Sequence, residues 1–221
     1  MLTCIVPTLN AATVWPLFAR ALRAATPPET VLILDSSSTD GTPQLARDAG
    51  FAVHTLARED FNHGGTRQLG VDLAFNSDIL VFLTQDAVLA DPTAIARLVG
   101  AFADPAVAVS YGRQLPRPGA RGIEAHARLF NYPPASEVRD LASRDRLGFK
   151  AAFLSNSFAA YRRTALAESG GFPRGVIFGE DTVTAGRLLL AGWKIAYVAE
   201  ARVYHSHGYS CMQEFRRSFD I

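Results

Sequence analysis

The sequence predicts an α/β fold, a mostly parallel Rossmann-like sheet with helices on both faces. Short apolar runs alternate with helical patterns through the first half, the arrangement that builds parallel strands joined by crossover helices. The length of 221 residues fits about one domain of this class. Hydrophobic residues make up 48% of the chain and charged residues 19%, which is enough apolar surface for a core. We therefore expect a single domain over residues 1–221.

Apolar runs bounded by turn residues predict the strands, and 3.6-residue periodicity predicts the helices. The expected strands cover residues 3–7, 31–35, 52–55, 79–83, 106–112, 158–161 and 194–198. The expected helices cover residues 15–25, 43–49, 66–75, 92–103, 123–130 and 181–191. Residues 114–147 are rich in Pro, Gly and Arg, which predicts a long loop around the short helix at 123–130. Residues 211–221 look helical but lack a stop signal, so we expect the sequence to be a piece of a longer protein.

The net charge and the cysteine content limit the partners and the cellular compartment that we expect for the protein. The formal net charge is +1, so the chain lacks the basic excess that grips many phosphates, and we expect no nucleic acid partner. Cys4 and Cys211 do not resemble a disulfide framework, which favours a reducing cytoplasm. No apolar run approaches the roughly 20 residues that span a bilayer. Peripheral contact with the inner face of a membrane is compatible with this composition.

Acidic residues stand at the ends of two expected strands. Asp35 closes the run at 31–35, and Asp86 follows the run at 79–83. Ligands of open parallel sheets bind beyond the carboxyl ends of the strands, so we expect both carboxylates at one rim, on neighbouring strands. A single acid in this place more often serves as a turn or cap residue. The pair favours a ligand site.

Several segments, taken in their order and spacing, resemble inverting glycosyltransferases of family 2, which have the GT-A fold. The segments are Ile5-Val6-Pro7-Thr8-Leu9-Asn10, Asp35 to Thr42, Asp86, Gly179-Glu180-Asp181 and His205-Ser206-His207. Within that family, three more segments are similar to bacterial rhamnosyltransferases: Phe61 to Arg67, Leu83 to Ala87 and Phe130-Asn131-Tyr132-Pro133. The resemblance implies a hexosyltransferase of polysaccharide biosynthesis. Its nucleoside diphosphate sugar donor would be dTDP-L-rhamnose, and its acceptor a hydroxyl of a carbohydrate or lipid-linked glycan.

The resemblance also implies a nucleotide-binding half at about 1–112, an acceptor-binding half at about 113–221, and roles for individual residues. Asp35 would accept a hydrogen bond from the nucleobase or ribose, beside an apolar wall. Arg67, behind two glycines at a helix start, would meet phosphate oxygens, although a solvated arginine is an equal alternative. The implied donor-binding residues are Pro7, Leu9, Asp35, His63, Arg67, Gln85 and Asp86.

A divalent cation, Mg²⁺ or Mn²⁺, is implied at Asp86, because such ions stabilise a departing diphosphate. The family usually has a pair of acids here, whereas this chain has Thr84-Gln85-Asp86. Gln85 would contact the donor through its amide. His205 and His207 alternate along an extended segment and share one face, so either could complete the metal site. We choose His207.

The resemblance assigns the catalytic base to Asp181, with Glu180 flanking it. Both acids open an expected helix, where the positive end of the helix dipole keeps a carboxylate ionised. Without the resemblance, simple helix capping is the better interpretation. Asn156 would border the acceptor cleft, and its alternative is a hydrogen-bonded core amide.

Two other functions remain open on the sequence. A nucleotidyltransferase usually has a glycine-rich basic loop after its first strand, but residues 7–12 here are Pro-Thr-Leu-Asn-Ala-Ala. A catalytically retired module that binds nucleotide sugar is supported only by the missing partner of Asp86. A dehydrogenase is disfavoured, since no Gly-x-Gly-x-x-Gly follows a strand.

Overall fold

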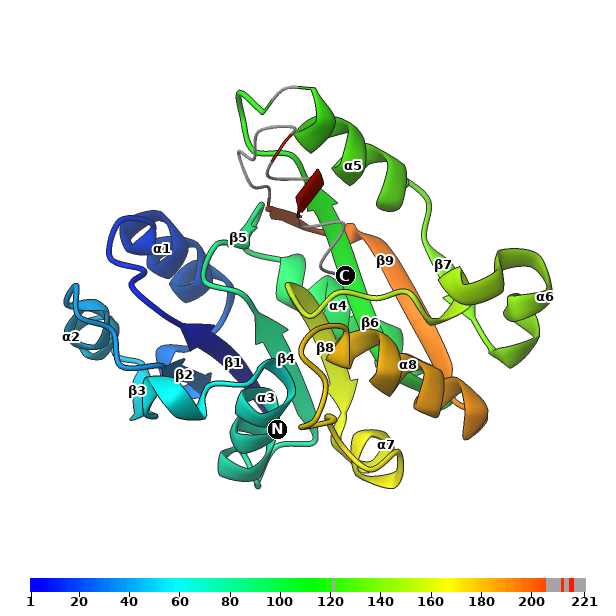
Figure 1. Cartoon of the computed structure of the whole chain (residues 1–221), viewed down its shortest axis with the longest axis horizontal. Coiled ribbons are helices and arrows are strands. Elements are labelled where there is room, and N and C mark those ends of the chain that lie inside the picture. The colour runs from blue at the N-terminus through cyan, green and yellow to red at the C-terminus, as the bar shows by residue number, and fades with distance from the viewer. Residues whose placement is uncertain (121, 206–211, 213–214, 217–221) are drawn as a thin grey trace.

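The computed structural model describes residues 1–120, 122–205, 212 and 215–216. In this part of the chain, one nine-stranded sheet has the order β3-β2-β1-β4-β8-β6-β9-β5, and β7 pairs with β9 (Figure 1). The strands are β1 Leu2–Thr8, β2 Val31–Asp35, β3 Ala52–Thr55, β4 Ile79–Leu83, β5 Val88–Leu89, β6 Val107–Leu115, β7 Glu137–Arg139, β8 Phe158–Arg162 and β9 Lys194–Tyr204. The helices are α1 Trp15–Ala25, α2 Thr42–Asp48, α3 His63–Leu73, α4 Ala94–Gly100, α5 Ile123–Asn131, α6 Arg144–Leu147, α7 Arg163–Glu168 and α8 Glu180–Leu190. This confirms the predicted α/β class.

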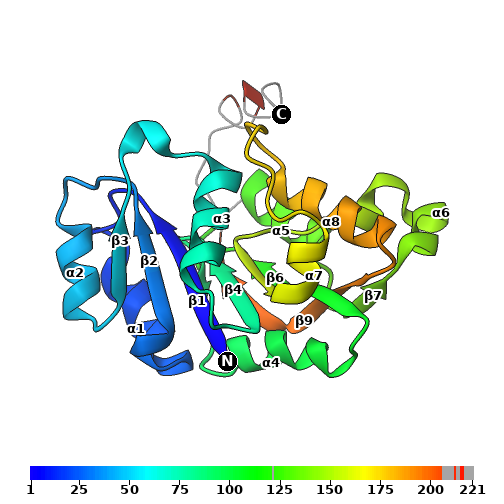
Figure 2. The ribbon, with the colours of Figure 1, turned by 90° about the horizontal axis from the view of Figure 1, so that it is seen from below.

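Helices cover both faces of the sheet, as predicted, because each central strand is apolar on both sides. Successive strand residues point to opposite faces. On β1, Cys4 and Val6 pack into a core with α1, α2 and α4, whereas Ile5 packs into a second core with α3, α7 and α8. All three side chains are 0% exposed. Figure 2 shows the two helix layers with the sheet between them.

The sheet is mixed rather than mostly parallel, because β8 enters it in the opposite direction. Strands β1 to β4 are parallel to one another, but β8 lies between β4 and β6 and is antiparallel to both. Residues 116–157, which follow β6, return to the sheet at the edge where β4 ends, since Leu83 pairs with Phe158. A chain that re-enters at this edge must run back across the sheet. The residues just before β8 are thereby placed at the carboxyl ends of β1, β2 and β4.

Strands β2 and β4 are not neighbours, contrary to our expectation, because β1 lies between them. The parallel pairing of β1 with each of them still brings all three carboxyl ends to one edge. Asp35 therefore lies at this edge and Asp86 lies just beyond it, with the end of β1 between them. The donor site expected from the sequence would be built on three strand ends.

The segment expected as a long loop is more ordered than its composition indicated. It contains the end of β6, the strand β7 and the helix α6, in addition to the predicted α5. Helix α3 begins at His63, three residues before the expected start, since Asn62 accepts a hydrogen bond from the Gly65 amide at 2.9 Å. Glycines in the first turn hid this start, because glycine is a poor helix former. Most of the expected helix at 211–221 lies outside the described residues.

Candidate active site

A network of side-chain hydrogen bonds joins the carboxyl ends of β1 and β2. The Asp35 carboxylate is 0% exposed and accepts hydrogen bonds from the Thr8 hydroxyl at 3.0 Å and from the Ser38 amide and hydroxyl at 2.8 and 2.6 Å. A carboxylate has about four acceptor positions, so the chain itself fills most of them. Asp35 thus orders the loop after β2, and its direct contact with a nucleobase or ribose stays a prediction.

The loops after β1 and β2 also hold each other in strained conformations. Asn10 and Ser37 have φ of 50° and 59°, the positive values that non-glycine residues rarely adopt. The Asn10 amide donates to the Ser38 hydroxyl at 2.8 Å, and its side-chain oxygen accepts from the Thr39 amide at 2.9 Å. Such strain persists only where surrounding contacts fix the backbone. The two loops therefore form a preformed wall at the strand ends.

The side-chain amide of Gln85 binds the loop after β1 through both of its polar atoms. Its Oε1 accepts from the Leu9 amide at 2.7 Å, and its Nε2 donates to the Leu9 carbonyl at 3.0 Å. Both polar ends of the amide are used, so Gln85 fixes the position of Leu9 in this structure, and its predicted direct contact with the donor stays a prediction. Pro7 and Leu9 are half-buried, which leaves part of each side chain available as an apolar wall.

Asp86 lies beside His205, the residue that directly follows β9. The Oδ2 of Asp86 is 3.3 Å from the Nε2 of His205, which is 5% exposed. Our choice of His207 lies outside the described residues. Among those described, no group of three or more His, Cys, Asp or Glu side chains gathers as a metal site. Asp86 and His205 are the pair that the fold brings together.

The hydrogen bonds of His205 determine what its Nε2 presents to Asp86. The Nδ1 lies 2.8 Å from the Oε1 of Gln114, which also accepts from the Arg128 guanidinium at 2.7 Å. A guanidinium only donates, so this atom of Gln114 is the oxygen, and Nδ1 of His205 carries the proton. With the proton on Nδ1, Nε2 is the ring atom that faces the carboxylate oxygen. That contact is favourable with a proton or a metal cation between the two atoms, so the donor set fits a divalent cation.

Sequence reasoning missed Gln114 and Arg128, which orient His205. Gln114 is 1% exposed and also donates to the Ser155 hydroxyl at 2.9 Å. It was placed in an expected loop, and only its buried position at the end of β6 reveals its role. Burial is a property of the fold, so no sequence signal identified Gln114.

Glu180 and Asp181 open helix α8, as predicted, but their side chains point to different partners. Glu180 is 5% exposed and forms an ion pair with Arg67, at 2.8 Å between Oε1 and Nη1. Asp181 is half-buried and accepts from the amides of Thr182 at 2.8 Å and Asn156 at 3.3 Å. Desolvation by burial, and then the charge of Glu180, raise the pKa of Asp181 to about 6. A carboxyl with a pKa near the working pH suits a general base.

Asn156 connects the two acids and is itself buried. It is 2% exposed, its Nδ2 donates to Glu180 at 3.2 Å, and its Oδ1 accepts from the Tyr161 hydroxyl at 2.7 Å. This geometry matches the alternative of a hydrogen-bonded core amide. Contact of its side chain with an acceptor stays a prediction.

Arg67 and His63 lie on the first two turns of α3, next to the acids of α8. Arg67 is 6% exposed, and its Nη1 also donates to the His63 carbonyl at 3.0 Å. The His63 ring makes edge contacts with Phe61 and Phe178, with ring centres 5.0 and 6.1 Å apart. Burial, followed by the charge of Arg67, lowers the pKa of His63. The predicted contacts of both residues with donor phosphates stay predictions.

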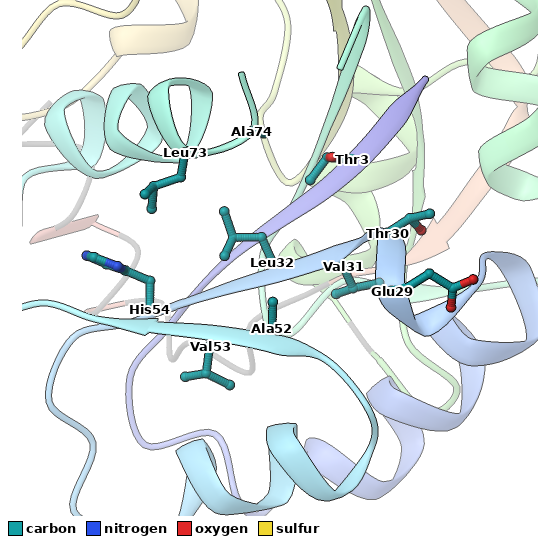
Figure 3. Close-up of a pocket in the computed structure, with 10 residues that line it drawn as sticks. All are labelled: Thr3, Glu29, Thr30, Val31, Leu32, Ala52, Val53, His54, Leu73 and Ala74. Carbon is teal, nitrogen blue, oxygen red and sulfur yellow. The ribbon is translucent and has the colours of Figure 1, made fainter. Parts of the chain in front are cut away.

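A separate cleft lies at the other end of the strands. It has a volume of about 360 Å³ and opens between α3 and the starts of β2 and β3, with Leu32, His54 and Leu73 among its lining residues (Figure 3). None of the predicted site residues lines it. Since ligands of this sheet type bind beyond the carboxyl ends, the strand-end cluster is the better candidate for an active site.

Comparison with known proteins supports the same assignment. The family model for glycosyl transferase family 2 matches residues 3–170. The chain is 46% identical over 221 residues to the O-antigen chain rhamnosyltransferase RfbN of Salmonella typhimurium, and 44% identical over 220 residues to WbaN of Salmonella anatum. These alignments cover 99% of this chain and 70% of each relative.

Solved glycosyltransferase structures share the fold. The mannosyltransferase PcManGT of Pyrobaculum calidifontis, in complex with GDP-Man and Mn²⁺, has a TM-score of 0.69 at 21% identity; the match covers 100% of this chain and 64% of that one. Glucosyl-3-phosphoglycerate synthase of Mycobacterium tuberculosis, in complex with Mn²⁺ and UDP-glucose, has a TM-score of 0.64 at 21% identity, over 99% and 75% of the two chains. The predicted GT-A fold is confirmed, and the chain belongs to the family 2 glycosyltransferases.

Proposed function

We propose that this chain is an inverting rhamnosyltransferase that moves L-rhamnose from dTDP-L-rhamnose to a hydroxyl of a growing, lipid-linked glycan. The observation that carries the proposal is the half-buried Asp181 at the start of α8, whose pKa is raised to about 6. The names of the relatives at 46% and 44% identity support the sugar and the glycan acceptor. We further propose that the enzyme works in the cytoplasm, in peripheral contact with the membrane that carries such an acceptor. Among the described residues, no helix is both long and apolar enough to cross a bilayer.

On this proposal, one displacement reaction exchanges two bonds at the anomeric carbon. The acceptor oxygen forms a bond to that carbon while the bond to the diphosphate breaks, and Asp181 takes the acceptor's proton. The attack comes from the face opposite the departing diphosphate, so the configuration inverts. Glu180 and Arg67 surround the base, and Asp35, Pro7 and Leu9 line the place of the nucleotide.

Asp86 and His205 would hold the divalent cation, Mg²⁺ or Mn²⁺. Such an ion, when bound, stabilises negative charge on the departing diphosphate as a Lewis acid. Two protein ligands suffice for ions of this kind, because donor phosphates and waters fill the other positions. The imidazole ligand favours Mn²⁺ over Mg²⁺, which prefers oxygen ligands. The Mn²⁺ in the two similar glycosyltransferase structures supports this choice.

The proposal is tested by incubating the protein with dTDP-L-rhamnose, Mn²⁺ and a short synthetic saccharide acceptor. NMR of the product should show a rhamnosyl linkage whose anomeric configuration is opposite to that of the donor. A retained configuration would exclude Asp181 as the base of a single displacement. Transfer from a uridine or guanosine donor alone would remove the rhamnosyl assignment, and nucleotide binding without any transfer would indicate a retired binding module.

A further inference from the structure

The burial of Arg67 does not fit a residue whose task is to meet a solvated diphosphate. Its side chain and that of Glu180 are 7% and 6% exposed, and their charged atoms are 2.8 Å apart. A buried ion pair often contributes no more stability than apolar residues of the same volume would. The fold alone therefore does not explain why two charges are placed here, between α3 and the start of α8.

A continuous set of hydrogen bonds leads from Arg67 to the proposed base. Glu180 accepts from Arg67 and from the Asn156 side chain through the same oxygen, Oε1. The Asn156 amide group is fixed at its other end by the Tyr161 hydroxyl, and its backbone N–H donates to Oδ2 of Asp181. A displacement of Glu180 would thus be transmitted through Asn156 to the Asp181 carboxylate.

The charged groups around Asp181 also include Arg67. Among the described residues, the titratable or charged groups that interact with Asp181 are Glu180, Arg67, Tyr161 and Tyr132. Burial raises the pKa of Tyr132 to about 12 and raises that of Tyr161 well above its usual value, so both phenols are neutral at working pH. Glu180 and Arg67 are therefore the charges that act on the base, and they act in opposite directions.

We propose, on the basis of the function proposed above, that Arg67 is a positioning residue for the catalytic base and not a ligand of the donor phosphates. It holds Glu180 in place and balances its charge, and Glu180 in turn orients Asp181 through Asn156. Arg67 acts on the transfer step and not on donor binding. Its effect should therefore depend on the presence of the Glu180 carboxylate.

A double-mutant cycle with Arg67→Met and Glu180→Gln separates the two roles. In the wild-type background, Arg67→Met should lower kcat about 30-fold or more and leave the dissociation constant of dTDP within about threefold. In the Glu180→Gln background the same change should lower kcat less than about threefold, since no buried carboxylate is left unpaired. Equal kcat losses in both backgrounds would overturn the proposal. A weaker affinity for dTDP in both backgrounds would assign Arg67 to the phosphates instead.

Two further variants guard against loss of folding. Arg67→Gln removes the positive charge but keeps hydrogen-bond donors, and it serves in the same cycle if Arg67→Met does not fold. Arg139→Met is the matched control: Arg139 is 3% exposed and donates to the Tyr111 hydroxyl and the carbonyls of Lys150 and Phe153. Its loss should lower stability without a kcat effect that depends on Glu180. If the kcat effect of Arg139→Met also depended on Glu180, the coupling would be a general consequence of destabilisation.

Titration of Asp181 by carbon-13 NMR tests the coupling without any substrate, with Asp181→Asn to assign the signal. Glu180→Gln should lower the midpoint, because a neighbouring negative charge is removed. Adding Arg67→Met to Glu180→Gln should raise it again, because a positive charge is removed. An unchanged midpoint in both variants would overturn the proposal. If the midpoints shift as expected but no nucleotide sugar supports transfer, the proposed function fails and the coupling stands.

Discussion

Asp181 combines the features that a general base requires, and they come from its surroundings and not from its residue type. Burial raises its pKa, while two backbone amides hold the carboxylate in one orientation. The sequence alone could place Asp181 at a helix start, but the desolvation that changes its proton affinity depends on tertiary packing. The family resemblance therefore identified the candidate, and the contacts of α8 with α3 and with the segment before β8 account for its chemistry.

Replacement of Asp181 by Asn tests its role in transfer. The amide keeps the shape of the side chain but cannot take the acceptor's proton, so kcat should fall by roughly 10²–10⁴ with donor affinity near normal. Initial rates at saturating donor and acceptor give kcat, and calorimetry with dTDP gives the affinity. Near-normal transfer by this variant would mean that Asp181 is a helix cap and that the base lies elsewhere.

The raised pKa of Asp181 also predicts how stability varies with pH. Between about pH 4 and pH 6 the folded state binds more protons here than the unfolded state does, because the pKa rises from 3.8 to about 6 on folding. The free energy of unfolding therefore falls as the pH rises through this window, by about 3 kcal/mol for this group. Asp181→Asn should unfold at a higher temperature than wild type at pH 8, and the difference should shrink at pH 4. An equal difference at both pH values would contradict the pKa assignment.

The donor side of the site depends on contacts between elements, above all between the loops that follow β1 and β4. Gln85 from one loop pairs with both backbone groups of Leu9 in the other. Sequence patterns predicted the two strands but could not predict this pairing, because the partners are 76 positions apart. The pairing of Asp86 with His205 was one of two that the family resemblance left open.

Loss of the Gln85 clamp should weaken donor binding. Gln85→Leu leaves the Leu9 amide and carbonyl without their partner, at a cost of about 1–3 kcal/mol, or roughly 5- to 150-fold in the dissociation constant of dTDP. Gln44→Leu is the matched control, since Gln44 is exposed on α2 and bonds only to Asp48 in the described structure. Calorimetry should show an unchanged affinity for the control. Unchanged affinity in Gln85→Leu would mean that the clamp does not shape the donor site.

Two adjacent glycines in α3 offer a test of how the loop before α8 is placed. A Cβ on Gly64 would lie 1.8 Å from the Pro173 carbonyl oxygen, whereas one on Gly65 would meet its nearest atom at 3.5 Å. Gly64→Ala must displace the loop that leads to Glu180 and Asp181, so kcat should fall at least tenfold. Gly65→Ala should retain kcat within about twofold and lose no thermal stability, since alanine favours helix over glycine. Similar kinetics in the two variants would contradict this placement of the loop.

At the scale of the whole molecule, the sequence predicted the regular βα half more completely than the second half. Strands and helices up to residue 112 follow clear periodic patterns, so their order and both helix layers are confirmed. The strand at 158–161 was predicted, but its antiparallel direction was not, because that direction depends on where the chain re-enters the sheet. The orientation of His205 by Gln114 and Arg128 was also missed, since it arises from distant elements meeting at one edge. Topology therefore decides which of the chemically plausible residues form the site.

The central claim is that Asp86 and His205 hold a cation against the diphosphate of a nucleotide sugar. Isothermal titration calorimetry of dTDP into the wild-type protein, with and without Mn²⁺, tests it most directly. Mn²⁺ should tighten binding at least tenfold, about 1.4 kcal/mol. His205→Ala and Asp86→Ala should each abolish this gain while their thermal unfolding stays cooperative. An equal gain from Mn²⁺ in wild type and in both variants, or no binding of dTDP under any condition, would contradict the account.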